Sequence, residues 1–336
     1  MKFVSRAPCR ISLIGGGTDV DPFAKKFGGK GLNLAISLYN QAELTPKKSP
    51  SITLSALGEK RHLTSVNHIP AYGQDKNFDL VYAVINHFKR HLPSGFDLKL
   101  TQTQDSLLGL GRSGSAAVAM IAAFEAWFKK PSSPKQLGLL AANLETKKLG
   151  WPGGKQDSLA AAFGGVNLMS FGPGEKTQVS PLKLSQTTIS DLKKRTIMVF
   201  VGGSRHSADQ QKKLIAGMSD QAKLKALFGL KAAVAPAAQA LKNKHWPLLG
   251  KILHQGWKDK KKTNPAVTTA AIDKIYSLAQ AHGAWGGKLS GSGGAGHMFF
   301  LLPPQKKSTT VKALTRAGAK EIKFNYDFTG AKTDAT

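Results

Sequence analysis

The segment that most constrains this chain is residues 108–117, LGLGRSGSAA, in which a glycine-rich loop leads into a helical pattern over about 113–128. Glycines let a backbone approach an anion closely, and the first turn of a helix offers free N–H groups and the positive end of its dipole. The segment therefore predicts a phosphate-binding cradle. It has neither the Gly-Lys-Ser/Thr of a Walker A loop nor the acidic residue that follows a dinucleotide fingerprint. A close-packed glycine turn without a ligand is the alternative.

A second glycine cluster lies far downstream, at residues 286–296 (GGKLSGSGGAG), just before a β-prone segment at 296–302. A hairpin or a bulge is the simpler interpretation. Ordering so many glycines costs backbone entropy, however, so we expect this loop to have a function.

The stretch 145–157, ETKKLGWPGGKQD, has a carboxylate at each end in a chain with only 20 acidic residues. Phosphoryl transfer needs a divalent cation held by oxygen ligands, and it gains from a carboxylate that orients the attacking hydroxyl. We assign the first role to Glu145 and the second to Asp157. A solvated surface acid is the alternative for either residue alone.

Near the N-terminus, residues 7–19 (APCRISLIGGGTD) place a cation, Arg10, and a carboxylate, Asp19, on either side of a glycine turn. A carboxylate only accepts hydrogen bonds, so it suits two neighbouring sugar hydroxyls. A pair of histidines, His87 and His91, has helical spacing, but no third metal ligand is evident near them.

The bulk composition is that of a globular protein, with 41% hydrophobic and 20% charged residues. The single cysteine, Cys9, excludes an internal disulfide framework, and no secretory leader or apolar run of about 18 residues is present. We therefore expect a cytoplasmic protein with no membrane partner. The net charge of +28 comes mostly from scattered lysines, since only eight of the 48 basic residues are arginine. No aromatic residues alternate with these lysines, so a solvated surface is favoured over nucleic-acid binding.

The order of elements predicts an α+β fold instead of a strict βαβ alternation. A domain boundary is expected near 170–195, which gives an N-terminal domain over 1–175 and a C-terminal domain over 176–336. Strands are predicted over 2–14, 33–45, 51–57, 96–103, 165–171, 196–202, 296–302 and 320–328. Helices are predicted over 78–91, 113–128, 135–148, most of 207–282, and 308–317.

In order and spacing, these segments resemble the three motifs of the GHMP kinases, the superfamily of galactokinase, homoserine kinase and mevalonate kinase. Within it the sequence looks like the D-glycero-D-manno-heptose 7-phosphate kinase branch. The residues that carry this likeness are APCRISLIGGGTD, then LGWPGGKQDSLAAAFGG at 149–165 and GAWGGKLSGSGGAGHMFFL at 283–301. The stretch 257–278 is also similar, so the resemblance covers nearly the whole chain.

The resemblance implies a two-domain α+β fold with the active site in the interdomain cleft, ATP as phosphoryl donor, and Mg²⁺. It makes Asp157 the catalytic carboxylate and places Arg10 beside the transferring phosphoryl group, with Ser113 and Glu145 holding Mg²⁺. The nucleotide phosphates would lie against Gly109, Leu110, Gly111, Arg112, Ser113, Gly114 and Ser115. Residues implied on the sugar side are Thr18, Asp19, Lys155, Arg205, Gly291, Gly293 and Gly294, with Arg205 or Lys155 on a remote phosphate and the last three closing over the site.

The phosphate loop departs from the family pattern, which usually has proline and glycine just before Gly-Leu-Gly. Here Asp105 brings a negative charge to an anion site and Leu107 removes the φ freedom of a glycine. We expect Arg112 to compensate by pairing with a phosphate or with Asp105.

The predicted function is an ATP-dependent sugar kinase that phosphorylates the anomeric hydroxyl of a heptose phosphate. Two alternatives stay open: a kinase for another sugar, of the galactose or fucose type, and a non-catalytic polyanion-binding protein on the same fold. The expected partner is a small sugar or sugar phosphate, and a homodimer is left open. Scattered lysines around a basic cleft favour the kinase, whereas one continuous basic stripe would favour nucleic acid.

Overall fold

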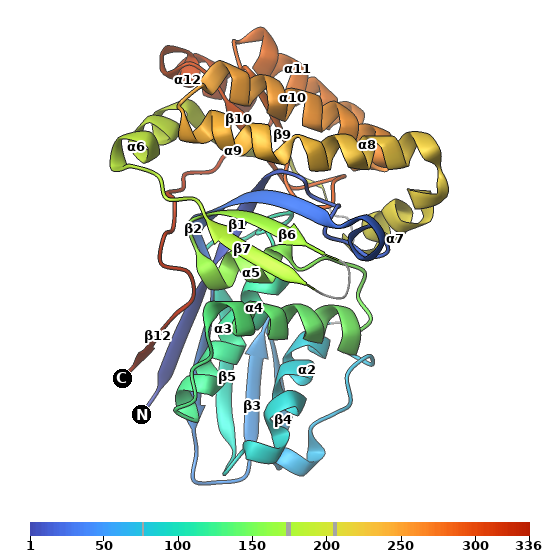
Figure 1. The fold of residues 1–336 in the computed structure, drawn as a ribbon. Helices are drawn as coiled ribbons and strands as arrows, with labels where there is room; N and C mark the ends of the chain where they lie inside the picture. Colours follow the sequence, from blue (N-terminus) through green and yellow to red (C-terminus); the bar gives the residue numbers. More distant parts are fainter. Residues whose placement is uncertain (76, 173–175, 204–206) are drawn as a thin grey trace.

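A computed structural model describes residues 1–75, 77–172, 176–203 and 207–336. Its helices and strands form two layered halves, one built on a large sheet and the other on a small sheet under a group of helices (Figure 1). The mixture of elements confirms the predicted α+β class. Within the described residues, no helix is both long and apolar enough to cross a membrane.

The eight-stranded sheet follows the order β12-β1-β2-β5-β3-β4, with β6 on β2 and β7 on β6. Its strands are β1 (Phe3–Ile14), β2 (Gly29–Pro46), β3 (Ile52–Ala56), β4 (Glu59–Leu63), β5 (Phe96–Gln102), β6 (Val166–Phe171), β7 (Thr177–Pro181) and β12 (Lys332–Ala335). The four-stranded sheet has the order β11-β8-β10-β9. Its strands are β8 (Thr196–Phe200), β9 (Gly286–Leu289), β10 (His297–Leu301) and β11 (Lys320–Glu321).

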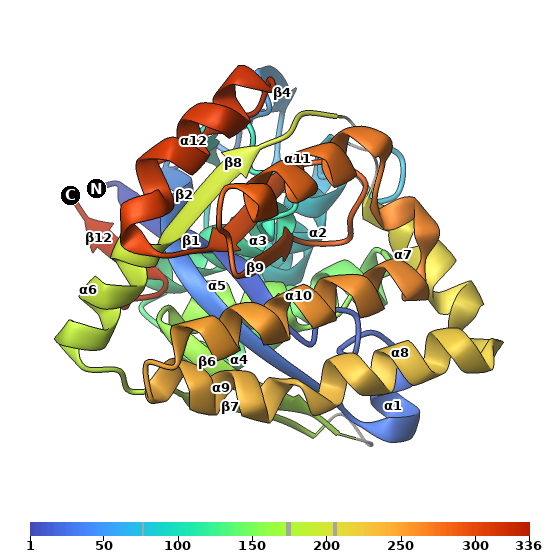
Figure 2. The same ribbon diagram turned by 90° about the horizontal axis from the view of Figure 1, so that it is seen from above.

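One group of helices packs with the large sheet, and a second group lies with the small sheet in the upper part of Figure 1 (Figures 1 and 2). In the N-terminal half they are α1 (Phe23–Phe27), α2 (Asp79–Phe88), α3 (Arg112–Trp127), α4 (Pro134–Asn143) and α5 (Gln156–Phe163). The remainder are α6 (Gln186–Arg195), α7 (Ser207–Ala216), α8 (Gln221–Ala232), α9 (Val234–Lys242), α10 (Trp246–Thr263), α11 (Ala270–Ala281) and α12 (Lys307–Arg316).

Strand β2 joins the two parts of the large sheet. Its first residues, from Gly29 to Leu34, pair with β6, and its last, from Asn40 to Pro46, pair with β5. Strand β1 runs antiparallel beside it, and the second half of β1 is buried on both faces. A strand buried on both faces usually reads as a continuous apolar run, and the sequence from Ile11 to Ile14 follows this except at the buried Ser12.

One hydrophobic cluster connects the two halves. It packs Leu13, Ile14 and Leu32 of the large sheet against Leu230 of α8 and Val234 of α9. Figure 2 shows α8, α9 and α10 lying across β1 and β2. Because this cluster is continuous, the end of β1 is held in a fixed position between the halves.

Most predicted elements are present, and the last predicted strand is the main error. Only Lys320–Glu321 of the expected strand 320–328 is a strand, and the chain then runs beside β2, where Tyr326 makes an isolated bridge to Ile36. The chain ends in β12, which pairs with β1. Strands β7 and β12 thus belong to the large sheet although they follow residue 175, and the boundary between 175 and 176 stays a prediction.

Candidate active site

The two residues predicted to be catalytic, Arg10 and Asp157, form an ion pair. Arg10, on β1, donates from Nε to Asp157 Oδ1 at 2.9 Å, and its Nη2 donates to the same oxygen. Its Nη1 donates to the carbonyl oxygen of Gly109 at 2.9 Å. The Arg10 side chain is only 5% exposed, whereas that of Asp157 is 38% exposed. The buried guanidinium therefore holds the carboxylate and the phosphate loop together, with the carboxylate open to solvent.

The predicted phosphate loop lies at the N-terminus of α3. Gly109 and Gly111 have φ values of 80° and 79°, the left-handed region that glycine adopts without steric cost. A Cβ on Gly111 would lie 3.2 Å from Cβ of Asp157, and one on Gly114 would lie 2.8 Å from the amide nitrogen of Ser158. The glycines thus let the loop and the start of α5 approach each other, which brings the N–H groups of α3 next to Asp157.

The three loop residues that depart from the family pattern have different surroundings. Leu107 is fully buried in the cluster that joins the halves, so it anchors the loop by packing. Asp105 and Arg112 are exposed, and within the described part of the chain they form no ion pair with each other. The expected pairing of Arg112 with Asp105 is therefore not observed.

Ser115 belongs to the core of this region. Its hydroxyl is fully buried, donates to the carbonyl oxygen of Arg112 at 3.1 Å, accepts from Nδ2 of Asn40, and contacts the thiol of Cys9 at 3.5 Å. Burial raises the pKa of the Cys9 thiol to about 12, which fits a small core residue. The Ser115 side chain thus fixes the helix start. Its amide donates to the carbonyl oxygen of Gly111 at 3.0 Å, so that N–H group is also used within the protein.

Asp19, which is predicted to hold sugar hydroxyls, lies in the turn after β1. Its Oδ1 accepts from the amide of Gly17 and its Oδ2 from the amide of Gln156, both at 3.2 Å. The second bond caps the first turn of α5, which contains Asp157. Burial raises the pKa of Asp19, and the negative charge of Asp157 raises it further. The two carboxylates are therefore close enough to influence each other.

The Thr18 hydroxyl has a structural role. It is completely buried, lies 2.8 Å from the carbonyl oxygen of Gly15 and 2.7 Å from that of Lys30, and accepts from the Lys30 amide at 3.0 Å. Its hydrogen-bonding capacity is used by the backbone. Thr18 thus stabilises the turn that presents Asp19, and the expected contact with a sugar hydroxyl is not supported.

Ser113 and Glu145 come together as the predicted metal pair. Glu145 lies in a π-helical turn over Leu144–Lys148, and its carboxylate is hydrogen-bonded by Ser113 in the first turn of α3. Withdrawal from solvent raises the pKa of Glu145 to about 7, the charge of Asp157 adds to this, and the Ser113 hydrogen bond opposes it. Two hard oxygen donors beside a phosphate cradle fit Mg²⁺, which usually takes its other ligands from phosphates and water. Among the described residues there is no group of three or more His, Cys, Asp or Glu side chains that could hold a metal ion by itself.

The third glycine loop packs on the phosphate loop. A Cβ on Gly291 would lie 2.6 Å from Cα of Gly109, and one on Gly296 would lie 2.6 Å from the carbonyl oxygen of Leu108. Nδ1 of His297 also lies 2.8 Å from that oxygen. The small-sheet half thereby contributes to the wall of the site.

The other predicted sugar-side residues have different outcomes. Gly293 and Gly294 lie against the turn at Val267, to whose carbonyl oxygen the Gly294 amide donates at 2.7 Å. Lys155 immediately precedes α5 and lies two residues before Asp157 in the sequence. Arg205 lies outside the described residues.

Sequence reasoning missed two lysines at this site. Lys260 of α10 and Lys288 of β9 are only 5% and 6% exposed, although lysine is almost never fully buried. Burial lowers the pKa of Lys260 to about 8 and that of Lys288 to about 7. Lys260 belongs to a lysine run that we interpreted as solvated, and that interpretation is wrong for this member. The signal available in the sequence was the position of Lys288 inside the third glycine motif.

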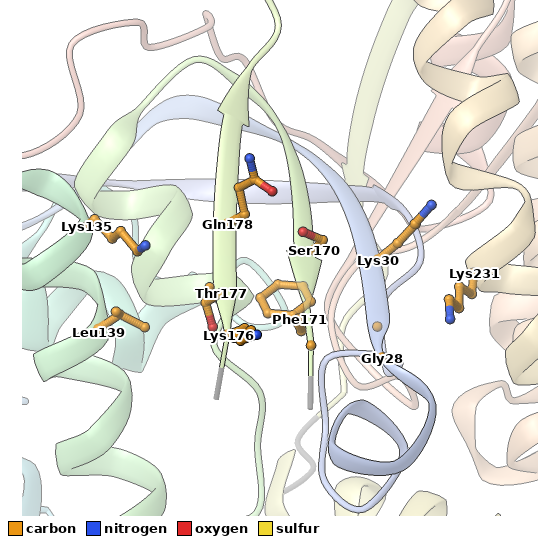
Figure 3. Close-up of a pocket in the computed structure, with 12 residues that line it drawn as sticks. Gly28, Lys30, Lys135, Leu139, Ser170, Phe171, Lys176, Thr177, Gln178 and Lys231 are labelled. Carbon is orange, nitrogen blue, oxygen red and sulfur yellow. The ribbon is translucent and has the colours of Figure 1, made fainter. Parts of the chain in front are cut away.

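A separate pocket of about 560 Å³ lies beside β6, β7 and α4 (Figure 3). Its lining includes four lysines, Lys30, Lys135, Lys176 and Lys231, and Nζ of Lys231 donates to the carbonyl oxygen of Phe27 at 2.6 Å. None of the predicted site residues lines it. We therefore give this pocket no part in the chemistry.

Comparison with known proteins agrees with this geometry. The family model described as GHMP kinases N terminal domain matches residues 79–165, and the model described as GHMP kinases C terminal matches residues 237–320. A curated relative from Campylobacter jejuni, D-glycero-alpha-D-manno-heptose 7-phosphate kinase, is 30% identical over 332 residues and covers 98% of each chain. The bifunctional fucokinase/GDP-fucose pyrophosphorylase of Arabidopsis thaliana is 25% identical over 91% of this chain and 30% of its own length.

Solved structures with a similar fold include sugar kinases. A D-glycero-D-manno-heptose 1-phosphate kinase from Bacteroides thetaiotaomicron superposes with a TM-score of 0.83 at 28% identity, covering 99% of each chain. A putative sugar kinase from Campylobacter jejuni superposes with a TM-score of 0.80 at 29% identity, covering 99% of this chain and 98% of its own. The galactokinase of Lactococcus lactis, at 16% identity and a TM-score of 0.76, shares the fold.

Proposed function

Because this chain belongs to the GHMP kinase family, we propose that it acts on a heptose phosphate, whose anomeric hydroxyl receives the γ-phosphoryl group of ATP. The chain is an ATP-dependent sugar kinase, and the acceptor and the residue roles below are the proposal. The observation that carries it is the Arg10–Asp157 pair placed directly at the N-terminus of α3. We expect the reaction to take place in the cytoplasm, where ATP is available.

Binding of the nucleotide phosphates follows from the loop geometry. Within the loop, the amides of Leu110 and Ser115 donate to the carbonyl oxygens of Leu107 and Gly111. The N–H groups of the first turn of α3, from Arg112 to Gly114, and the positive end of the α3 dipole are left to the phosphate oxygens. Arg112, exposed at the first position of α3, is free to approach a phosphate from solvent. The third glycine loop, packed on Gly109, limits the access of water to this region.

The transfer step places the acceptor hydroxyl at Asp157. The bond from the acceptor oxygen to the γ-phosphorus forms as the bond to the β–γ bridging oxygen breaks, ADP leaves, and the hydroxyl proton passes to the carboxylate. Arg10 neutralises the charge on the transferring group, because its guanidinium is buried and pre-positioned by Gly109. Asp19 orients the sugar through its other hydroxyls.

Ser113 and Glu145 are the residues that would hold Mg²⁺. When bound there, the ion neutralises charge on the phosphate oxygens. The raised pKa of Glu145 supports this role, because a carboxyl withdrawn from water without a cation prefers its neutral form.

The test is ADP release from ATP in the presence of Mg²⁺ and one of five acceptors: heptose 7-phosphate, heptose, mannose, galactose and fucose. We expect efficient turnover with heptose 7-phosphate. Turnover with fucose or galactose alone would overturn the proposed acceptor and retain the sugar kinase. If the protein binds ATP but none of the five acceptors supports ADP release, the proposed function is overturned and the polyanion-binding alternative is favoured.

A further inference from the structure

Two buried ammonium groups face the glycine turn that follows β1. Nζ of Lys260 lies 3.4 Å from the carbonyl oxygen of Gly16, and a Cβ on Gly17 would lie 3.1 Å from it. Nζ of Lys288 would lie 4.0 Å from a Cβ on Gly16. The two lysines come from α10 and β9, which lie above the end of β1 in Figure 1. The small-sheet half thus places two cations against a turn of the large-sheet half.

The charge of these lysines is not balanced within the described part of the protein. The ammonium group of Lys288 has no hydrogen bond and no ion pair there, and the charged groups that act on it are two further cations, Lys260 and Arg10. Among the described residues, Nζ of Lys260 has only the long bond to the carbonyl oxygen of Gly16 and the attraction of Asp19, whose oxygens already accept two amide hydrogens. An isolated buried ammonium is costly, so the arrangement is suited to an anion that arrives with a ligand.

Two hydroxyl groups in the same region also have no partner. Ser12 Oγ and Ser290 Oγ are buried and form no hydrogen bond with any described residue. Ser12 Oγ lies 2.9 Å from the position of a Cβ on Gly16, the same position that Lys288 Nζ faces. Buried hydroxyls are nearly always paired, so unpaired donors beside unpaired ammonium groups indicate a ligand with several acceptor oxygens. A phosphate group has this chemistry.

The charged residues around the two lysines indicate whether the bound phosphate belongs to ATP or to the acceptor sugar. The carboxylate whose charge acts on Lys260 is Asp19, which is proposed to hold the sugar. The pKa of Glu145, which is proposed to hold the metal, is affected by Ser113 and Asp157. We propose that Lys260 and Lys288, with Ser12, bind the phosphate group that the acceptor sugar already carries. This inference rests on the proposed function and makes the two lysines the residues that select a sugar phosphate over a neutral sugar. It gives them a task that the sequence had suggested for Arg205 or Lys155.

The test compares Lys260→Met and Lys288→Met with the wild type on heptose 7-phosphate and on heptose, at saturating ATP. Removal of one charged hydrogen bond should raise KM for the phosphorylated acceptor by about ten- to a hundredfold. KM for heptose and kcat on both acceptors should change by less than about threefold, because neither ammonium is then used. Lys262→Met is the matched control. Lys262 belongs to the same lysine run as Lys260, but its side chain is 63% exposed and pairs with Asp259.

Other kinetic outcomes overturn the inference. An equal fall of kcat on both acceptors would place the lysines on the phosphoryl group of ATP. An unchanged KM for heptose 7-phosphate would leave them only a structural role.

Calorimetric titration of inorganic phosphate into the ATP-free proteins separates this inference from the proposed acceptor. We expect binding to the wild type and to Lys262→Met, and at least a tenfold loss in Lys260→Met and Lys288→Met. Absence of phosphate binding in the wild type, or equal binding in all four proteins, would overturn the anion site whichever sugar is phosphorylated. If either variant fails to fold, the wild-type protein alone still tests the anion site. Inorganic phosphate should then compete with heptose 7-phosphate for binding and leave the affinity for ATP unchanged.

Discussion

Arg10 directs two guanidinium nitrogens at a single oxygen of Asp157, Oδ1, while Oδ2 forms no hydrogen bond with any residue that the structure describes. One oxygen is therefore used to position the carboxylate, and the other is available to an incoming hydroxyl. This division of roles is compatible with the proposed function of Asp157 as a proton acceptor, although the carboxylate is paired with a buried arginine.

The first prediction concerns this pair. Asp157→Asn keeps the shape of the side chain and removes its ability to take the proton, so kcat should fall by about 10²–10⁴-fold. The KM for ATP should change by less than about threefold, because the nucleotide is held by the α3 loop. Steady-state ADP release measures both. Turnover near that of the wild type would remove Asp157 from the catalytic role.

The second prediction concerns the metal pair. Glu145→Gln should raise the Mg²⁺ concentration for half-maximal activity by about tenfold, because the amide is a weaker ligand than the carboxylate. In the wild type the same concentration should rise as the pH falls from 8 to 6, since the pKa of Glu145 near 7 makes the proton compete with the metal. The variant should lose that dependence, and a Mg²⁺ requirement equally pH-dependent in both proteins would contradict the assignment.

A third prediction uses stability. Burial lowers the pKa of Lys288 to about 7 from 10.5, so the unfolded chain binds more protons than the folded one between these values. This residue therefore makes the free energy of unfolding rise with pH across that window. Lys288→Met removes the contribution, so the variant should be more stable than the wild type at pH 7, with a difference that shrinks towards pH 10. Urea unfolding of both proteins at several pH values gives the answer, and a pH-independent difference would refute it.

A fourth prediction separates backbone strain from contact between the loops. Gly291 and Gly318 both have positive φ, 79° and 93°, but a Cβ on Gly318 would meet nothing within 4 Å. Gly318→Ala should cost about 1 kcal/mol and leave kinetics unchanged. Gly291→Ala should cost more and raise KM for ATP, because its Cβ would overlap the backbone of Gly109. Equal effects of the two substitutions on KM would show that the packing of the loops is irrelevant to nucleotide binding.

The sequence predicted the parts of the site that are built from local patterns. The glycine loop before α3, the cation of β1 and the carboxylates at 145 and 157 are motif residues, and the structure brings them together. Long-range burial was not predictable from local patterns. Lys260 looks like any member of a solvated lysine run until α10 packs against the turn of Gly16, and Thr18 looks like a sugar ligand until Lys30 takes its hydroxyl.

The return of β12 to the large sheet has a mechanical consequence. The chain passes between the halves twice, once after β7 on the way to β8 and once between β11 and β12. The second passage is fastened to β2, where the amide of Asp327 donates to the carbonyl oxygen of Ala35 and the amide of Ser37 to that of Asn325. Separation of the halves would have to break these hydrogen bonds as well as the shared hydrophobic cluster, so the two halves should unfold as one cooperative unit.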